Sequence, residues 1–451
     1  MTSIALCIFA FFLGVAGGRR SLVTGVGCVL AVGYPYGILR ANILQPFSHF
    51  IFDSAVVGLY VSQLQRPLTL VQRRRIRELR SWFIALIGWP VLLTLLPVQD
   101  YLVQLAGLRG NVFLLGFVLL GALMTADELV ELTTWLAVLN LAAFGFAVAE
   151  YFVGIEPFFP RSSVTEIMYA SLDIYTSSGA QYRIPATFSS AHAYAGTMAM
   201  TSTVFFGALN AGGRLGRRSP LVLAALLASL VGIFMAGARS PVVVIGLVIL
   251  YVILFGGLRI STAVLGLVLA GTVGFVVLRT ERLQRFLSLN ETDYVSTRVE
   301  SSLNVTFLDL AEQYPMGNGI GGGGTSIPYF LADRVRDRVG MENEYARIML
   351  EQGLPGLLMW VAFLLSMLLR SYPRRRDDTR LARRLIWVYC VISFATAFIG
   401  TGLLASIPGS ALLLMFLGFI SPGGERLGMA AGPVGAASAA PAPPALRRYA
   451  T

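Results

Sequence analysis

The sequence contains no lysine. All 35 basic residues are arginine, and only 13% of the 451 residues are charged, about half the charged fraction of a typical soluble protein. A GC-rich genome accounts for arginine use of this kind, while bidentate recognition of phosphate or carboxylate suits only a few of the arginines. The low charge argues against a soluble globular chain.

Cysteine and histidine are also scarce. Cys7, Cys28 and Cys390 all lie in apolar runs, with neither metal-ligand spacing nor the pattern of a disulfide framework. His49 and His192 are the two histidines, too few for a typical histidine-built metal site. We therefore expect no metal and no other cofactor.

Apolar sequence dominates what is present. Hydrophobic residues make up 56% of the chain and the mean hydropathy is +0.71, with apolar runs of about 15–25 residues recurring from end to end. This pattern predicts an all-α, polytopic transmembrane helix bundle of about 12–13 spans. We expect spans near residues 3–16, 21–38, 47–61, 81–97, 111–124, 129–153, 190–209, 220–236, 241–256, 260–278, 345–369, 385–401 and 406–420.

The net charge of +11 would suggest nucleic acid in a soluble chain, but here it lies mostly in short loops and indicates topology. Arginine is dense near residues 19–20, 73–80, 214–218 and 370–384, and sparse in the alternate connections. The positive-inside rule places the dense loops in the cytoplasm. Two long loops, 154–189 and the partly helical 279–342, then face outward.

We expect one membrane domain over residues 1–420. The segment 421–451 is rich in Gly, Ala and Pro, which is typical of a disordered tail, here on the cytoplasmic side. The N-terminal run lacks a basic region before it and is interpreted as a retained span.

Three polar residues stand beside apolar runs on the predicted outer face. Arg183 ends the first long outer loop, and His192 falls in the first turn of the next span. Arg239 lies in a short Gly/Ser/Pro break between two spans, which would hold it at the membrane edge; an arginine that snorkels to the interface is the alternative. In the second long loop, Arg298 could point at a site, although a solvated helix face is the favoured interpretation.

The stretch Tyr314–Met359 is the most informative part of the sequence, because a glycine-rich polar loop and a Glu-Asn-Glu-Tyr cluster lead directly into a predicted span. Gly319, Gly321 and Gly324 satisfy G-x-G-x-x-G, but no strand precedes them and no Gly-Lys-Ser/Thr follows, so a dinucleotide site and a P-loop are both excluded. Glycines such as Gly317, Gly319 and Gly321 instead let the backbone approach a polar ligand closely; a surface turn is the alternative.

The cluster after this loop opens an apolar helix. Asn343 is a plausible N-cap. Spacings of three and four residues among Glu344, Arg347 and Glu351 predict pairing on the helix surface. Glu342 has no such partner, which makes it the more interesting acid, with Asn343 and Tyr345 beside it.

These motifs resemble the O-antigen ligase and polymerase superfamily of bacterial membrane glycosyltransferases, and a Wzy-type polysaccharide polymerase in particular. Position 342 is glutamate, as in the polymerases, whereas the ligases that act on lipid A carry histidine at the matching position. The resemblance covers residues 180–360 and rests on Arg183, Arg239, Pro315-Met-Gly317-Asn-Gly319, Glu342-Asn343-Glu-Tyr345 and Glu351-Gln-Gly353-Leu-Pro-Gly356.

The resemblance implies a GT-C-like fold and a metal-independent transfer of glycan from undecaprenyl pyrophosphate at the outer face of the bacterial inner membrane. Arg183, Arg239 and Glu342 would be catalytic. His192, Arg298, Asn343, Tyr345 and the loop glycines would bind the substrate. The partners implied are the lipid-linked oligosaccharide, the bilayer, and a flippase and a chain-length regulator.

Two other functions stay open. A glycan ligase would move the finished chain to a lipid or protein acceptor on the same fold. A transporter or flippase would more often show repeated halves and charges at mid-span, whereas this chain has one asymmetric polar loop and nearly charge-free spans.

Overall fold

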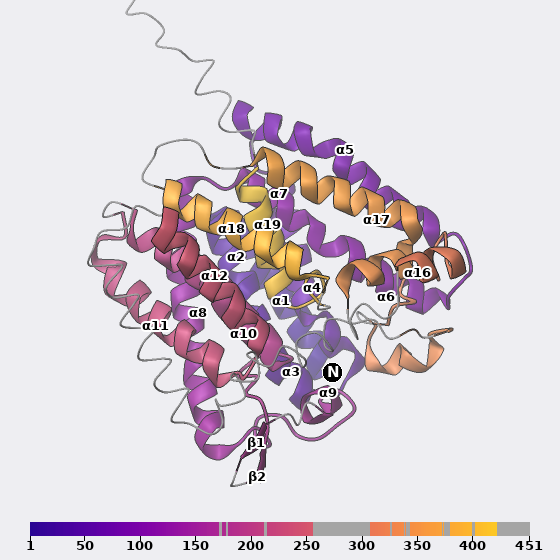
Figure 1. Cartoon of the computed structure of the whole chain (residues 1–451), viewed down its shortest axis with the longest axis horizontal. Coiled ribbons are helices and arrows are strands. Elements are labelled where there is room, and N and C mark those ends of the chain that lie inside the picture. The colour runs from indigo at the N-terminus through magenta and orange to yellow at the C-terminus, as the bar shows by residue number, and fades with distance from the viewer. Residues whose placement is uncertain are drawn as a thin grey trace, which may run out of the picture.

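The computed structural model is a bundle of helices with one short β-hairpin at its edge (Figure 1). It describes residues 1–170, 174–176, 179–211, 214–255, 307–324, 327–337, 339, 343–371, 373, 379–398 and 402–421. The predicted tail 421–451 therefore lies almost wholly outside the described residues, as does the predicted span 260–278. The all-α polytopic architecture predicted from the sequence is confirmed.

The elements follow in chain order. The first half contains α1 (Thr2–Arg20), α2 (Leu22–Gly33), α3 (Tyr36–Asn42), η1 (Pro46–Phe50), α4 (Ile51–Leu64), α5 (Leu70–Leu93), α6 (Tyr101–Val112), η2 (Phe113–Leu115), α7 (Gly116–Leu123), α8 (Ala126–Val153) and α9 (Glu166–Ala170). The second half contains β1 (Ile174–Thr176), β2 (Gly179–Gln181), α10 (Ala191–Leu209), η3 (Gly216–Arg218), α11 (Ser219–Met235), α12 (Arg239–Phe255), α16 (Phe307–Gln313), η5 (Tyr329–Arg334), α17 (Glu344–Arg370), α18 (Arg380–Thr396) and α19 (Gly409–Phe419). Strands β1 and β2 pair antiparallel.

Five helical segments are long and apolar enough to cross a membrane, and the bent pair α2–α3 would make a sixth. The five are Thr2–Arg20, Tyr101–Leu123, Ala126–Val153, Gly216–Met235 and Glu344–Arg370. This number, which covers only the described residues, is smaller than the 12–13 spans predicted. One reason is length, because several predicted spans are shorter helices such as α12 and α19, with 17 and 11 residues.

Two predicted loops proved to be helical. The arginine run near Arg75 belongs to α5, which starts at Leu70 under a capping box from Thr69. The expected loop 98–110 is largely α6, capped by Asp100. The bundle satisfies its polar residues: the Gln104 side chain, for example, donates to the Leu96 carbonyl.

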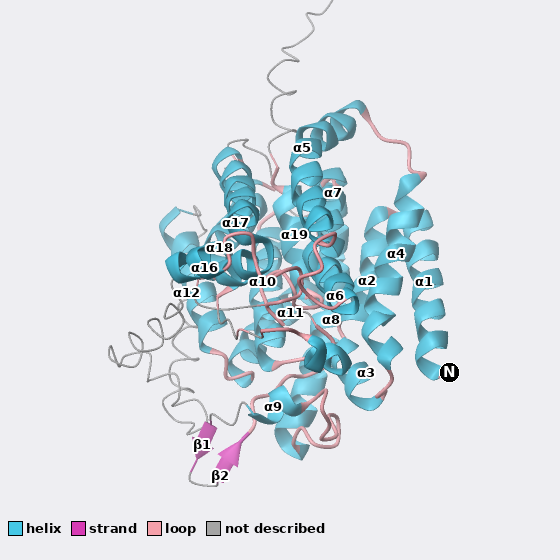
Figure 2. Cartoon of the chain, turned by 90° about the vertical axis from the view of Figure 1, so that its right-hand side faces the viewer, coloured by secondary structure: helices cyan, strands magenta, loops and turns pink. Residues whose placement is uncertain are grey.

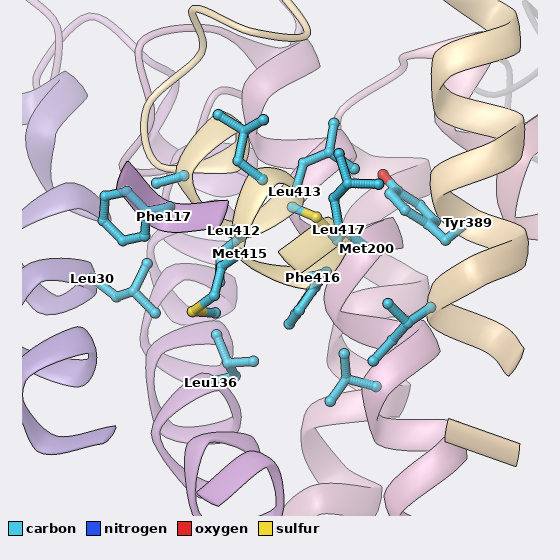
Figure 3. Close-up of a cluster of buried hydrophobic side chains, with 14 of the residues drawn as sticks. Leu30, Phe117, Leu136, Met200, Tyr389, Leu412, Leu413, Met415, Phe416 and Leu417 are labelled. Atoms are coloured by element: carbon cyan, nitrogen blue, oxygen red, sulfur yellow. The ribbon is translucent and has the colours of Figure 1, made fainter. Parts of the chain in front are cut away.

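The bundle core surrounds α19, whose apolar side chains lie among those of α2, α7, α8, α10 and α18 (Figure 3). Helices α7 and α19 approach closely because each contributes a glycine. A Cβ on Gly121 would collide with the Met415 carbonyl, and one on Gly418 with the Val118 carbonyl. Small residues that let backbones meet are the usual means of packing helices in membranes.

One polar network crosses this apolar core. The Asn140 amide of α8 accepts a hydrogen bond from the Tyr34 hydroxyl at 2.6 Å and donates to Thr201 and Ser229 at 2.7 Å each. Asn140, Thr201 and Ser229 are 0% exposed. A satisfied network of this kind fixes the register of α2, α8, α10 and α11.

The bundle has two chemically different ends, and Figure 2 shows α9 and the β-hairpin at the lower one. The arginine-dense segments gather at the opposite end, which we call the arginine-rich end: Arg66 pairs with Glu128 at 3.1 Å and Arg214 with Asp127 at 2.7 Å. The elements around the loop Pro315–Gly324 meet at the end away from these arginines, which we call the glycine-loop end. The described arginine-dense segments therefore share an end, and the side of the membrane that each end faces stays a prediction.

Candidate functional site

Arg183 and His192 meet at the glycine-loop end. Arg183 follows strand β2, and Ser190 caps α10 by accepting a hydrogen bond from the Ala193 amide at 3.1 Å. This cap places His192, which is exposed, in the first turn of α10. The Nη1 of half-buried Arg183 lies 3.4 Å from the Nε2 of His192. The structure thus brings together two residues that the sequence placed on different elements.

Glu150 supports this segment, and the sequence reasoning did not single it out. It lies in the last turn of α8, is 2% exposed, and accepts a hydrogen bond from the Ala186 amide at 2.8 Å. Ala186 has a φ of 52°, a conformation that costs energy for a residue other than glycine. An isolated acid at the end of a long apolar run was the available signal.

Arg239 directly follows a break of three residues, 236–238, between α11 and α12. Helix α11 ends at Met235, Gly237 has a φ of 64°, and α12 begins at Arg239, so the short break predicted around this arginine is present. Arg239 is half-buried. Helices α10 and α11 pack closely here, because a Cβ on Gly232 would collide with the Tyr194 hydroxyl. Arg239 therefore lies at the same end of the bundle as Arg183 and His192.

The glycine loop packs against the protein itself. Gly317, Gly319 and Gly321 have φ values of 89°, 84° and 86°, which L side chains rarely adopt. A Cβ on Gly107 of α6 would collide with the Gly321 backbone, and a Cβ on Gly317 would lie 2.8 Å from the Gly353 amide nitrogen. The close backbone approach indicated by these glycines is made to α6 and α17, and their contact with a substrate stays a prediction.

Helix α17 is broken at Gly353, whereas the sequence predicted an uninterrupted span over 345–369. Gly353 has φ 69° and ψ −177°, and Pro355 follows it. The carbonyls that the break frees find other donors. The Asn318 amide donates to the Leu350 carbonyl at 2.6 Å, and the Trp89 indole donates to the Gln352 carbonyl at 2.8 Å. The Glu-x-Gly-x-x-Gly motif is thus joined to the glycine loop and to α5.

The predicted pairing of Arg347 with two acids is present, but its location on the helix surface was wrong. Arg347 lies 2.6 Å from Glu344 and 3.0 Å from Glu351, and all three side chains are at most 1% exposed. Asn111 of α6 donates to Glu351 at 2.6 Å. Spacing along one helix cannot reveal that α6 and the glycine loop cover this face, so the ion pairs lie in the interior.

The beginning of α17 is fixed by side chains that the sequence singled out. Asn343 caps the helix as predicted, accepting from the Tyr345 and Ala346 amides at 2.9 and 3.1 Å. The Tyr345 hydroxyl donates to the Phe394 carbonyl of α18 at 2.7 Å. Glu344 accepts from the Gly402 amide at 2.7 Å. The predicted residues Glu342 and Arg298 lie outside the described residues, so their roles remain predictions.

The described residues contain no group of three or more His, Cys, Asp or Glu side chains that could hold a metal ion. Half-buried arginines with an adjacent histidine are the groups present here that can bind an anionic oxygen.

Comparison with known proteins gives one family. Residues 224–361 match the family model described as O-antigen ligase, and no curated protein matches the chain. The match contains the break with Arg239, the glycine loop, the Asn343 cap and the Gly353 break. The chain is a multi-pass helical membrane protein, and its segment from within α11 to within α17 is similar to the O-antigen ligase family.

Proposed function

We propose that this protein is a polysaccharide polymerase. It transfers a glycan from undecaprenyl pyrophosphate to the next lipid-linked unit at the outer face of the bacterial inner membrane. The observation that carries the proposal is the gathering of Arg183, His192 and Arg239 at one end of the bundle, opposite the arginine-rich end. The family match supports glycan transfer of the ligase or polymerase type.

The chemistry follows from the leaving group. Pyrophosphate departs with negative charge, so it needs cations more than it needs an acid. Arg183 and Arg239 can each donate paired hydrogen bonds to phosphate oxygens and stabilise the charge that develops. His192 at the N-terminus of α10 orients Arg183 and adds a position that favours anions.

The acceptor hydroxyl must be oriented and must lose its proton. Glu342, which immediately precedes the cap Asn343 in the sequence, is the proposed base. A carboxylate near arginines is a weak base, which suits a transition state in which the bond to pyrophosphate breaks first and the proton leaves late. The transfer would then be inverting and independent of metal.

Glutamate at 342 favours a polymerase, because the lipid A ligases that the chain resembles have histidine there. The alternative, a glycan ligase, is supported by the description of the matching family as O-antigen ligase. A flippase that delivers the lipid-linked unit and a chain-length regulator are the partners that a polymerase implies.

The test is the glycan made in cells that carry Glu342→Gln or Arg239→Ala. Each change should abolish long polymer while single lipid-linked repeat units accumulate. Arg161→Gln is the control, since Arg161 is an exposed residue of the 154–170 loop paired with Glu156. Full-length polymer from the first two variants would contradict these site assignments.

Deletion of the gene separates polymerase from ligase. A single repeat unit on the final acceptor indicates lost polymerisation. Complete polymer retained on the carrier lipid indicates lost ligation and would overturn the polymerase proposal.

A further inference from the structure

A second group of basic side chains lies at the glycine-loop end, on elements that the proposed chemistry does not use. Arg40 is in the last turn of α3, His49 in η1 and Arg109 in the last turn of α6. Arg109 is held by Asp53 of α4, with its Nη2 2.9 Å from Oδ1. This carboxylate neutralises Arg109 and leaves the group with a net positive charge from Arg40.

The backbone of His49 is fixed from two sides. Its carbonyl accepts hydrogen bonds from the Tyr36 hydroxyl at 3.1 Å and from Arg109 Nη2 at 3.4 Å. Its ring packs against Tyr329 and Phe330 of η5, with centroids 5.6 Å away in each case. The imidazole is therefore held in place before any ligand arrives.

Two buried nitrogens of this group lack a hydrogen-bond partner among the described residues. One is Nε2 of His49, whose side chain is 4% exposed, and the other is Nε of Arg40. In the described chain no carboxylate pairs with Arg40, whose guanidinium instead lies 5.4 Å from the Tyr36 ring. Buried polar groups are nearly always satisfied in folded proteins. With the tautomer of His49 assigned as Nε2–H, both nitrogens are donors that an acceptor oxygen of a ligand would satisfy.

Apolar side chains border these basic side chains. Leu44 and Phe47, which precede His49, are 53% and 52% exposed. On α6, Leu102 and Leu105 are 44% and 42% exposed, and their spacing of seven and four residues from Arg109 puts all three on one helix face. A ligand with an anionic head and an apolar chain matches this arrangement better than a free anion does.

We propose that Arg40 and His49 form a second phosphate site, which holds the pyrophosphate of the lipid-linked acceptor. The inference rests on the proposed polymerase. Both reactants of a polymerase carry the same lipid pyrophosphate, so the enzyme must hold two: the donor's, which leaves, at Arg183 and Arg239, and the acceptor's, which stays intact. A ligase whose acceptor carries no such carrier needs one site.

Electrostatics at His49 agree with this role. Burial and the neighbouring Arg40 and Arg109 guanidiniums lower the pKa of His49 to about 3, so the ring is neutral at physiological pH and keeps one N–H to donate. Arg109 cannot serve in place of Arg40, because Asp53 already accepts hydrogen bonds from it.

The test is equilibrium binding of farnesyl pyrophosphate to the purified full-length protein in phosphatidylethanolamine nanodiscs. The unmodified protein should bind two equivalents. Arg40→Gln should weaken one of them by roughly 10- to 100-fold, the loss expected for one charge-assisted contact. Arg183→Gln combined with Arg239→Gln should remove the other. Arg161→Gln, an exposed arginine in the 154–170 loop, is the matched control and should bind two.

Competition identifies the ligand. Inorganic pyrophosphate should displace the probe from the Arg40 site only weakly, and nanodiscs that contain phosphatidylglycerol should leave the affinity unchanged. Equal affinity for inorganic pyrophosphate would overturn the lipid-linked assignment. Displacement by phosphatidylglycerol would show a general headgroup site and would overturn it too.

The inference would also be overturned if the unmodified protein bound only one equivalent of farnesyl pyrophosphate. It would be overturned too if both Arg40→Gln and His49→Asn bound two equivalents with unchanged affinity. Arg40 is half-buried, so its variant should fold even where His49→Asn does not. Failure of the proposed function looks different: Arg239→Ala would still make polymer in cells, while Arg40→Gln would still lose one binding equivalent.

Discussion

Three arginines in or beside the sequence motifs, Arg347, Arg183 and Arg239, fall into two groups that differ in burial. Arg347 is 1% exposed and lies between two carboxylates of its own helix. Arg183 and Arg239 are half-buried; Arg183 lies between β2 and α10, and Arg239 is the first residue of α12. A buried cation between two anions stabilises the fold and has no free surface for a ligand, whereas a half-buried one can reach an anion. The three arginines therefore include a buried one that belongs to the scaffold, while a role of Arg183 and Arg239 in holding substrate stays a proposal.

Replacing Arg347 should have the largest effect on stability. Arg347→Met leaves Glu344 and Glu351 buried without their cation, and breaking a buried pair in this way costs about 3–5 kcal/mol. We expect little folded protein, measured as the monodisperse fraction after heating in detergent. A variant that also carries Glu344→Gln and Glu351→Gln should recover part of the loss. Full stability of Arg347→Met alone would show that these ion pairs do not hold the scaffold.

The break in α17 should come next. Gly353→Ala forces a side chain into a conformation that is essentially restricted to glycine, and its Cβ would lie 2.6 Å from the Met316 carbonyl carbon. Strain of this kind costs about 1–3 kcal/mol. The melting temperature should fall measurably. Gly145→Ala in α8 is the control, because a Cβ there meets nothing within 4 Å, and it should not destabilise the protein.

These two regions also show which structural features can be predicted from the sequence. Arginine density was enough to predict which loops share an end, and the short break predicted the local position of Arg239. Periodicity along one helix predicted that Arg347 pairs with Glu344 and Glu351. It could not predict that α6 covers them, because Asn111 and Glu351 are 240 residues apart in the chain.

The structural roles of the glycines and of Pro355 could not be predicted from the sequence, for a physical reason. A positive φ serves a ligand loop and a tight contact between helices equally well, so Gly317 and Gly321 could not be assigned from the sequence. Hydropathy likewise treats Gly353 and Pro355 as part of one span. Only the donors that arrive from Asn318 and Trp89 show that the helix is interrupted and satisfied there.

His49 gives a smaller effect that depends on pH. Its pKa is lowered to about 3 by burial, Arg40 and Arg109, while an unfolded histidine titrates near 6.5. Between these values the unfolded chain binds the extra proton, so stability is complete above pH 6.5 and falls as the pH is lowered toward 3. The groups that surround the ring on the packed elements are Tyr36, Arg40, Asp53, Arg109 and Tyr329.

Melting temperatures measured from pH 7 to pH 4.5 test this dependence. His49→Asn should flatten the curve in this interval, because asparagine does not titrate. An identical slope in the variant would show that other groups, such as Asp53, cause the acid sensitivity.

Arg183→Gln should have the smallest effect on stability and separates the two groups of arginines most directly. Arg183 is half-buried, and the contact at 3.4 Å joins it to His192, which is exposed. Substitutions at such positions usually change stability by less than about 0.5 kcal/mol. Removing one group that stabilises charge in a transition state nevertheless costs roughly 100- to 1000-fold in rate. We therefore expect an unchanged melting temperature, as in Arg161→Gln, together with loss of polymer. If Arg183→Gln unfolded the protein as Arg347→Met does, Arg183 would belong to the scaffold, and the division between the two groups would fail.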